Sequence, residues 1–157
     1  MKLSRVLILA ALSFLLFSCN DDDGSFTQIK SSEHLLYNAI KEYRNSNGQD
    51  GPFVHQYLMV KEAQLYSYKM ANGFEALGTQ GLQEHWDTLD EKFTFYNRDG
   101  LVIRSETGDE DQILSEILQI PGADSVLLND LTQCGVGIEV DTSGLNYITI
   151  LLAKADS

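Results

Sequence analysis

The side chains best suited to proton transfer or metal binding in this chain are its three histidines. They are His34, His55 and His85, and no two of them have the spacing that would bring both to one face of a helix. Glu84 precedes His85 in the densest polar cluster, yet adjacent residues on a helix point in different directions. We therefore expect each histidine to be an exposed or core-edge residue rather than a catalytic base or a metal ligand.

Carboxylates are the other groups that could touch a cation or a substrate. The run Asp109, Glu110 and Asp111 does not have the spacing of a calcium loop, and the dipole of a helix accounts for acidic residues at its first turn. Glu106 is the one carboxylate that we single out as a candidate for contact with a cation or a substrate. Signatures of a serine nucleophile, a phosphate-cradling glycine loop or a Cys/His pair are absent from the sequence. The residue types thus give little support to catalysis.

The N-terminal segment has the pattern of a lipoprotein signal. Lys2 and Arg5 accompany an apolar run at residues 6–17, which is too short for a comfortable membrane span. The run ends in a Leu-Phe-Ser-Cys sequence at Cys19, which resembles a bacterial lipobox. We predict a signal peptide at residues 1–18 and acylation of Cys19, with the membrane as partner of that lipid. The alternative is a plain secretory signal that is cut elsewhere.

Residues 19–30 are polar and poorly patterned, and they predict an acidic flexible tether. Their Asp-Asp-Asp run looks like the surface-export signals of Bacteroidetes lipoproteins. We therefore expect an outer-membrane lipoprotein, and leave open whether it faces the periplasm or the exterior.

Charge and cysteine content narrow the possible partners. The sequence carries 11 Lys+Arg against 23 Asp+Glu, a formal net charge of −12. Loss of residues 1–18 would remove Lys2 and Arg5, which leaves 9 basic against 23 acidic residues, or −14. Such a surface repels phosphate backbones, so we expect no nucleic-acid partner. Cys134 would be the single thiol after Cys19, and we expect it to be a small buried residue.

The rest of the chain alternates between helical and strand patterns. Apolar residues recur at three- and four-residue steps in four segments, which predicts helices near residues 31–45, 55–71, 82–91 and 108–120. Residues 124–131 predict one or two further turns. Two β-branched runs at 136–140 and 147–152 flank turn residues and predict an antiparallel hairpin, whose second strand has both faces covered. A shorter hairpin is predicted at 93–96 and 101–104.

Four of these segments resemble one known family. Residues 36–44 and 63–71 are similar to the opening of a bacterial CAP domain, in the superfamily of cysteine-rich secretory proteins, antigen 5 and pathogenesis-related proteins. Residues 134–138 and 147–150 are similar to its closing hairpin. The resemblance covers about residues 32–154 and implies an α+β fold, a three-layer α–β–α sandwich with a small antiparallel sheet, in a domain at 31–157.

In that family a shared cleft carries histidines and glutamates, which bind a divalent metal in some members. The resemblance places Thr79, Leu101 and Ala123 at these positions. No histidine follows His85. A divalent metal needs at least two or three converging donors, and general acid–base chemistry needs a titratable group. We therefore assign no catalytic, metal-binding or cofactor-binding residue, and no cofactor.

These observations predict an exported, lipid-anchored, non-catalytic binding or interaction module of the cell envelope. Its ligand could be a small apolar molecule, a glycan or a protein. The alternative is an enzyme, an envelope-polymer hydrolase or a divalent-metal-dependent enzyme, with a relocated site around Glu84, His85 and Glu106. A purely structural envelope protein is a third possibility. Because one fold serves many functions, the resemblance does not identify the ligand.

Overall fold

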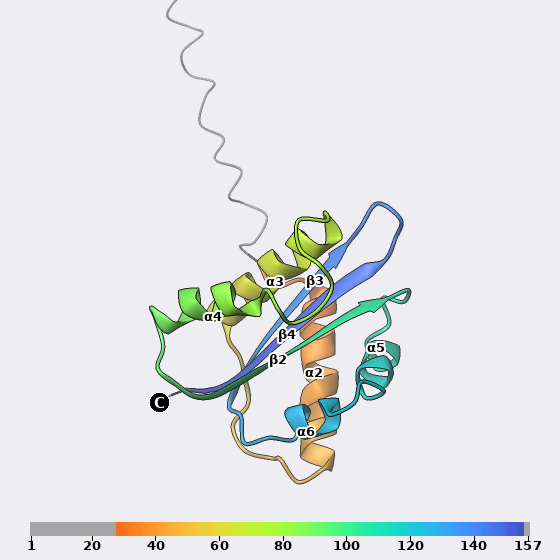
Figure 1. The fold of residues 1–157 in the computed structure, drawn as a ribbon. Coiled ribbons are helices and arrows are strands. Elements are labelled where there is room, and N and C mark those ends of the chain that lie inside the picture. Colours follow the sequence, from red (N-terminus) through yellow and green to blue (C-terminus); the bar gives the residue numbers. More distant parts are fainter. Residues whose placement is uncertain (1–27, 156–157) are drawn as a thin grey trace, which may run out of the picture.

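The computed structural model describes residues 28–155 (Figure 1). The elements of this part follow one another as α2 (Ser31–Ser46), β1 (Val54–His55), α3 (Tyr57–Ala71), α4 (Leu82–Asp90), β2 (Phe95–Ser105), α5 (Glu110–Ile117), α6 (Ala123–Leu127), β3 (Gln133–Val140) and β4 (Asn146–Ala155). None of the helices in residues 28–155 is long and apolar enough to cross a membrane. The predicted signal peptide, Cys19 and tether residues 19–27 lie outside the described residues.

The four strands of this part form one sheet in the order β1-β3-β4-β2. The predicted C-terminal hairpin is confirmed: β3 and β4 are antiparallel, from Gln133 opposite Ala153 to Val140 opposite Asn146. Asp141 fixes the turn, because its Oδ1 accepts hydrogen bonds from the backbone nitrogens of Ser143 (2.8 Å) and Leu145 (3.0 Å). The two residues of β1 pair with β3 in parallel, so the sheet is mixed rather than wholly antiparallel as expected.

The sheet lies between two layers of helices, with α2, α5 and α6 on one face and α3 and α4 on the other (Figure 1). Side chains of β4 alternate between the two hydrophobic cores. Ile148 and Ile150 join the core beneath α2, whereas Leu151 and Ala153 join the core beneath α3. The predicted three-layer α+β architecture and the central position of this strand are therefore confirmed.

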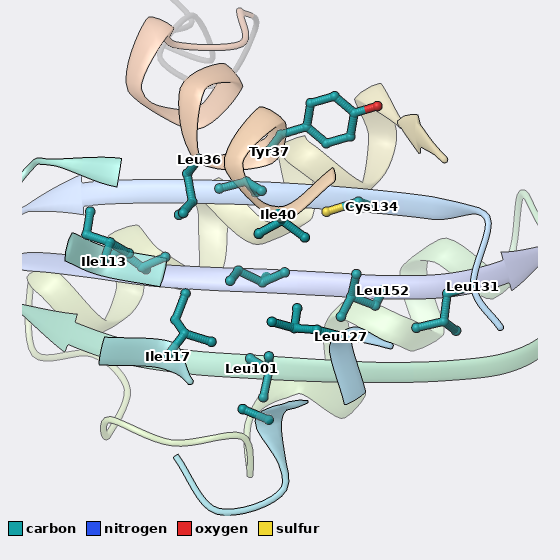
Figure 2. Close-up of a cluster of buried hydrophobic side chains, with 14 of the residues drawn as sticks. Leu36, Tyr37, Ile40, Leu101, Ile113, Ile117, Leu127, Leu131, Cys134 and Leu152 are labelled. Carbon is teal, nitrogen blue, oxygen red and sulfur yellow. The ribbon is translucent and has the colours of Figure 1, made fainter. Parts of the chain in front are cut away.

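The core beneath α2 is mostly aliphatic and also includes Tyr37 and Phe53 (Figure 2). Arg44 closes one end of it and is 3% exposed. Its guanidinium donates hydrogen bonds to the backbone oxygens of Leu127, Asn129 (3.1 Å) and Leu131 (2.9 Å). Because these carbonyls precede β3, Arg44 joins the end of α2 to the segment that enters the sheet.

The predicted hairpin at 93–96 and 101–104 is wrong. Residues Phe95–Ser105 form one strand of 11 residues, which pairs with β4 from Phe95 opposite Ala155 to Ser105 opposite Asn146. The Asn97-Arg-Asp-Gly100 sequence has turn chemistry, but a ladder along the whole of β4 outweighs that local preference. Gly100 consequently sits in the strand opposite Leu151, where it contributes to the site.

Candidate functional site

A hollow of about 360 Å³ opens between α4, the loop before it and β2. This volume falls at the lower end of the range of small-molecule sites. Its lining comes from three stretches of chain and consists of Thr79, Gln80, Leu82, Gln83, Trp86, Arg98, Asp99 and Gly100. Because several separate segments converge on it, the hollow is our candidate binding site.

Tyr66 of α3 holds the loop that forms one wall of the hollow. Its hydroxyl donates a hydrogen bond to the backbone oxygen of Gly78 (2.8 Å) and accepts one from the backbone nitrogen of Gly81 (3.2 Å). A Cβ on Gly81 would lie 2.7 Å from the ring of Tyr66, so a side chain there would displace the ring. Tyr66 is 1% exposed, and burial raises its pKa. The loop bearing Thr79 and Gln80 is therefore fixed by a buried anchor.

The apolar floor of the hollow forms where α4 approaches β2. A Cβ on Gly100 would lie 2.5 Å from Cδ1 of Leu82, so the glycine lets the first turn of α4 come close to the strand. Trp86 packs edge-on against Phe95, with 5.7 Å between the ring centroids. The guanidinium carbon of Arg98 lies 5.5 Å from the centroid of the Trp86 ring. Apart from Leu82, Trp86 and Gly100, the residues that line the hollow are polar.

The polar groups at the mouth both donate and accept hydrogen bonds. Gln83 donates from Nε2 to Oδ1 of Asp87 (2.6 Å), which leaves its amide oxygen for a ligand. Asp99 accepts a hydrogen bond at Oδ1 from the backbone nitrogen of Gly100 (2.8 Å), which leaves its Oδ2 to accept a hydrogen bond from a ligand. Arg98 is already paired with Asp90 at 2.6 Å. The lining holds amides, a hydroxyl, a carboxylate and a guanidinium, and no imidazole.

The three positions that the family resemblance assigned to the ancestral cleft do not come together. Thr79 lines the hollow, but Leu101 and Ala123 are 7% and 1% exposed and belong to the core beneath α2. Figure 2 shows Leu101 in that core. Successive residues of a strand face opposite sides of the sheet. Gly100 therefore faces the hollow while Leu101 faces the other layer. A cleft shared by these three residues is a prediction that the geometry contradicts.

The fold does bring two histidines together, which the sequence did not reveal. His34 of α2 and His55 of β1 are stacked with ring centroids 6.0 Å apart, and His55 stacks on Tyr37 at 4.4 Å. Burial, with His34 nearby, lowers the pKa of His55 to about 4. Ring nitrogens lie in the ring planes, so stacked imidazoles do not aim their lone pairs at one point. Among residues 28–155, no three His, Cys, Asp or Glu side chains are placed to hold a metal.

The relocated catalytic site considered above does not assemble either. His85 is 2% exposed and points toward α3, where its Nδ1 lies 2.8 Å from Oε2 of Glu62. Glu84 points away and pairs with Lys69 at 3.2 Å. Glu106 is exposed and follows Ser105, the last residue of β2. Glu62 was missed by sequence reasoning, although its position one turn before Tyr66 on α3 places it on the buried face.

Two smaller predictions are confirmed, that of acidic residues at the start of a helix near 108–120 and that of a buried Cys134. Asp109 caps α5, because its Oδ1 accepts a hydrogen bond from the backbone nitrogen of Gln112 (2.9 Å). Cys134 is fully buried on β3, and burial raises the pKa of its thiol well above the usual value. A buried thiol with a raised pKa is a poor nucleophile. Neither group takes part in the candidate site.

No family model matches the chain, and no curated protein sequence matches it. Solved structures do share its fold. An outer surface protein of Borrelia burgdorferi is similar with a TM-score of 0.68 and 16% identity, over 82% of this chain and 96% of that protein. Venom allergen-like protein 4 of Schistosoma mansoni is similar with a TM-score of 0.56 and 13% identity, over 82% and 92%.

A third similar structure is longer than this chain. It is an extracellular protein containing an SCP domain from Bacillus anthracis, with a TM-score of 0.61 and 18% identity. The similarity covers 78% of this chain, which spans 40% of that protein. The chain therefore has the fold of the CAP superfamily, also called the SCP fold, as the resemblance of its sequence predicted. At these identities the likeness establishes the fold alone.

Proposed function

We propose that this chain, whose domain has the CAP fold, is an exported and lipid-anchored protein of the cell envelope that binds a ligand without transforming it. The binding site is the hollow between α4 and β2. Export and anchoring are supported by the lipobox-like sequence at Cys19. A place at the cell surface is supported by the similar fold of a Borrelia outer surface protein and of an extracellular Bacillus protein.

The chemistry of the lining is the observation that carries the binding role. General acid–base catalysis needs a group that exchanges a proton near the working pH and reaches the substrate. Amides and hydroxyls such as those of Gln80, Gln83 and Thr79 do not titrate there. Arg98 is paired with Asp90. Asp99 is the single carboxylate of the lining, so the hollow has no pair of carboxylates to act as acid and base. The hollow is thus equipped to hold a molecule by hydrogen bonds.

A hydrolase remains the second candidate because of one contact. The pairing of His85 with Glu62 has the arrangement of a base and the group that orients it, and Nε2 of His85 has no hydrogen-bond partner among the described residues. A catalytic base must nevertheless reach its substrate, and His85 is 2% exposed. Catalysis by this pair would require α4 to move away from α3.

Metal titration of the soluble domain from Ser25 onward separates the binding module from a divalent-metal-dependent enzyme. Zinc, calcium and magnesium are each added in excess, and the free energy of unfolding is measured in urea with and without chelator. A ligand stabilises a protein only by binding its native state. For the binding module we expect the same free energy of unfolding with and without metal. An increase above about 1 kcal/mol on metal addition would favour the metal-dependent enzyme.

Anchoring has a separate test in whole cells. Cys19→Ser removes the thiol that an acyl chain would occupy. Without this thiol no acyl chain can be attached at residue 19. The precursor is then expected to keep its signal peptide, or the domain to be released from membranes. Membrane association and mobility identical to those of the unchanged protein would contradict lipidation.

A further inference from the structure

The lining of the hollow points to one class of ligand, and we propose that it is a neutral saccharide of one or two rings. This inference rests on the proposed binding function and on the same hollow. Sugar hydroxyls each donate and accept a hydrogen bond, and so do the groups that meet at the mouth: the Thr79 hydroxyl and the amides of Gln80 and Gln83.

Charge argues against an anionic ligand. Arg98 is the basic residue of the lining, and its guanidinium is already neutralised by Asp90 at 2.6 Å. Asp99 lines the same hollow and would repel a phosphate or carboxylate. The whole chain has a formal net charge of −12, which adds a repulsive long-range field. A phosphate would therefore meet more carboxylates than free cations.

The lining also disfavours a fully apolar ligand and a bare cation. Burial of the amides and of the Asp99 carboxylate beneath an alkyl chain would remove their water without replacing its hydrogen bonds. A cation would find one carboxylate in the lining, since Asp90 is paired with Arg98 and Asp87 accepts a hydrogen bond from Gln83. Neither ligand uses the mixture of donors and acceptors that the hollow presents.

The floor completes the match to a sugar. Leu82 and Trp86 are 4% and 5% exposed, so they provide a small apolar surface beneath the polar mouth. A sugar ring presents C–H groups on one face and hydroxyls at its edge. Gly100 lets Leu82 lie against the strand and form this floor, because a Cβ at position 100 would come within 2.5 Å of Cδ1 of Leu82. The volume of about 360 Å³ is small for a ligand site, which restricts the ligand to one or two rings rather than a long polymer segment.

Trp86 provides the measurement, because it is the single tryptophan of the sequence and lies in the lining. The domain from Ser25 onward contains both hydrophobic cores and is used alone. The fluorescence of Trp86 is followed while this domain is titrated with four probes. Maltose and N,N′-diacetylchitobiose are neutral disaccharides, glucose 6-phosphate is an anion, and dodecanoate is an apolar chain. A saturable change with at least one neutral disaccharide is expected, and none with the phosphate or the fatty acid.

Two variants and a matched control locate the binding. Gln83→Ala and Asp99→Ala each remove hydrogen bonds at the mouth and are expected to weaken disaccharide binding about three- to tenfold, the effect of losing one such bond. Gln112→Ala removes an exposed glutamine from α5 in the other helical layer and should leave the affinity unchanged. Equal affinities for all three variants would overturn the inference.

The other outcomes separate this inference from the proposed function. If glucose 6-phosphate or dodecanoate gives the saturable change, with the same dependence on Gln83 and Asp99, the saccharide inference fails while a binding site in the hollow stands. If no probe changes the fluorescence of Trp86, both the saccharide ligand and the assignment of the site to this hollow are contradicted.

Discussion

Nδ1 of His85 on α4 lies 2.8 Å from Oε2 of Glu62 on α3, and both side chains are buried between the two helices. The ring of Tyr66 packs edge-on against the same imidazole at 5.2 Å. Because α4 also forms one wall of the hollow, this contact sets the position of the wall. The histidine closest in sequence to the hollow thus acts as a link between helices and does not line the ligand site.

Removing one partner of this link should destabilise the domain. Glu62→Ala leaves the imidazole of His85 buried without its hydrogen bond, which is expected to lower the free energy of unfolding by about 1–3 kcal/mol. Urea denaturation measures it. Glu84→Ala breaks the exposed pair with Lys69 and should cost about 0–1 kcal/mol. Equal effects of the two variants would show that the buried contact does not stabilise the fold.

The close approach of α3 to β3 predicts a larger effect at a glycine. A Cβ on Gly137 would lie 2.2 Å from the backbone carbon of Ala63, and backbone cannot move aside as a flexible side chain can. Gly137→Ala is therefore expected to cost at least about 3 kcal/mol or to prevent folding. Gly51→Ala, where nothing lies within 4 Å, is the matched control. A soluble Gly137→Ala domain of unchanged thermal stability would contradict this packing.

Arg44 should be needed for its hydrogen bonds as well as its charge. Arg44→Met keeps much of the side-chain volume but leaves the backbone oxygens of Leu127, Asn129 and Leu131 without their donor. Leu127 and Leu131 are buried whereas Asn129 is exposed, and each unsatisfied buried carbonyl costs about 1–3 kcal/mol. We expect a loss of at least about 2 kcal/mol, measured by thermal unfolding. Full stability of Arg44→Met would mean that water replaces the guanidinium at these carbonyls.

His55 predicts a loss of stability in acid. Its folded pKa is about 4, below the value near 6.5 of an unfolded histidine, so the unfolded chain binds the proton first. His55 thus costs nothing above about pH 6.5, and stability falls as the pH drops from there toward 4, by at most about 3 kcal/mol. The pKa of Glu33 is also shifted, upward by burial, so other groups contribute to the profile.

The variant His55→Phe isolates the histidine from those groups. It keeps a ring against Tyr37 but cannot take up a proton. Unfolding free energies at pH 7 and pH 4 are compared for both proteins, and the wild type is expected to lose more stability between the two. The same loss in His55→Phe would place the acid sensitivity elsewhere.

The sequence predicted the layers of this fold because hydrophobic spacing is a local property. The helical repeats and the nearly unbroken apolar run of β4 each point to a buried element without knowledge of its partner. The pairing of β2 depends on residues about 50 positions away, and its local turn residues suggested a hairpin instead. Pairing between distant strands overrode that signal, as context commonly does for strands.

The candidate site was harder to predict than the fold. Thr79 was singled out and does line the hollow, but Leu101 lies one residue from Gly100 and therefore on the opposite face of the sheet. Alignment to a family motif does not resolve such a one-residue difference, which reverses the side of a strand. The stacking of His34 on His55 likewise arises from the pairing of β1 with β3. No local sequence pattern predicts that pairing.

Binding without conversion is tested most directly by one NMR titration of the isotope-labelled soluble domain with N,N′-diacetylchitobiose, followed by analysis of the sugar. Amide shifts confined to residues 79–86 and 98–100, with the disaccharide recovered intact, are expected. Shifts centred instead on His34 and His55, or recovery of the cleaved monosaccharide, would contradict a non-catalytic site between α4 and β2.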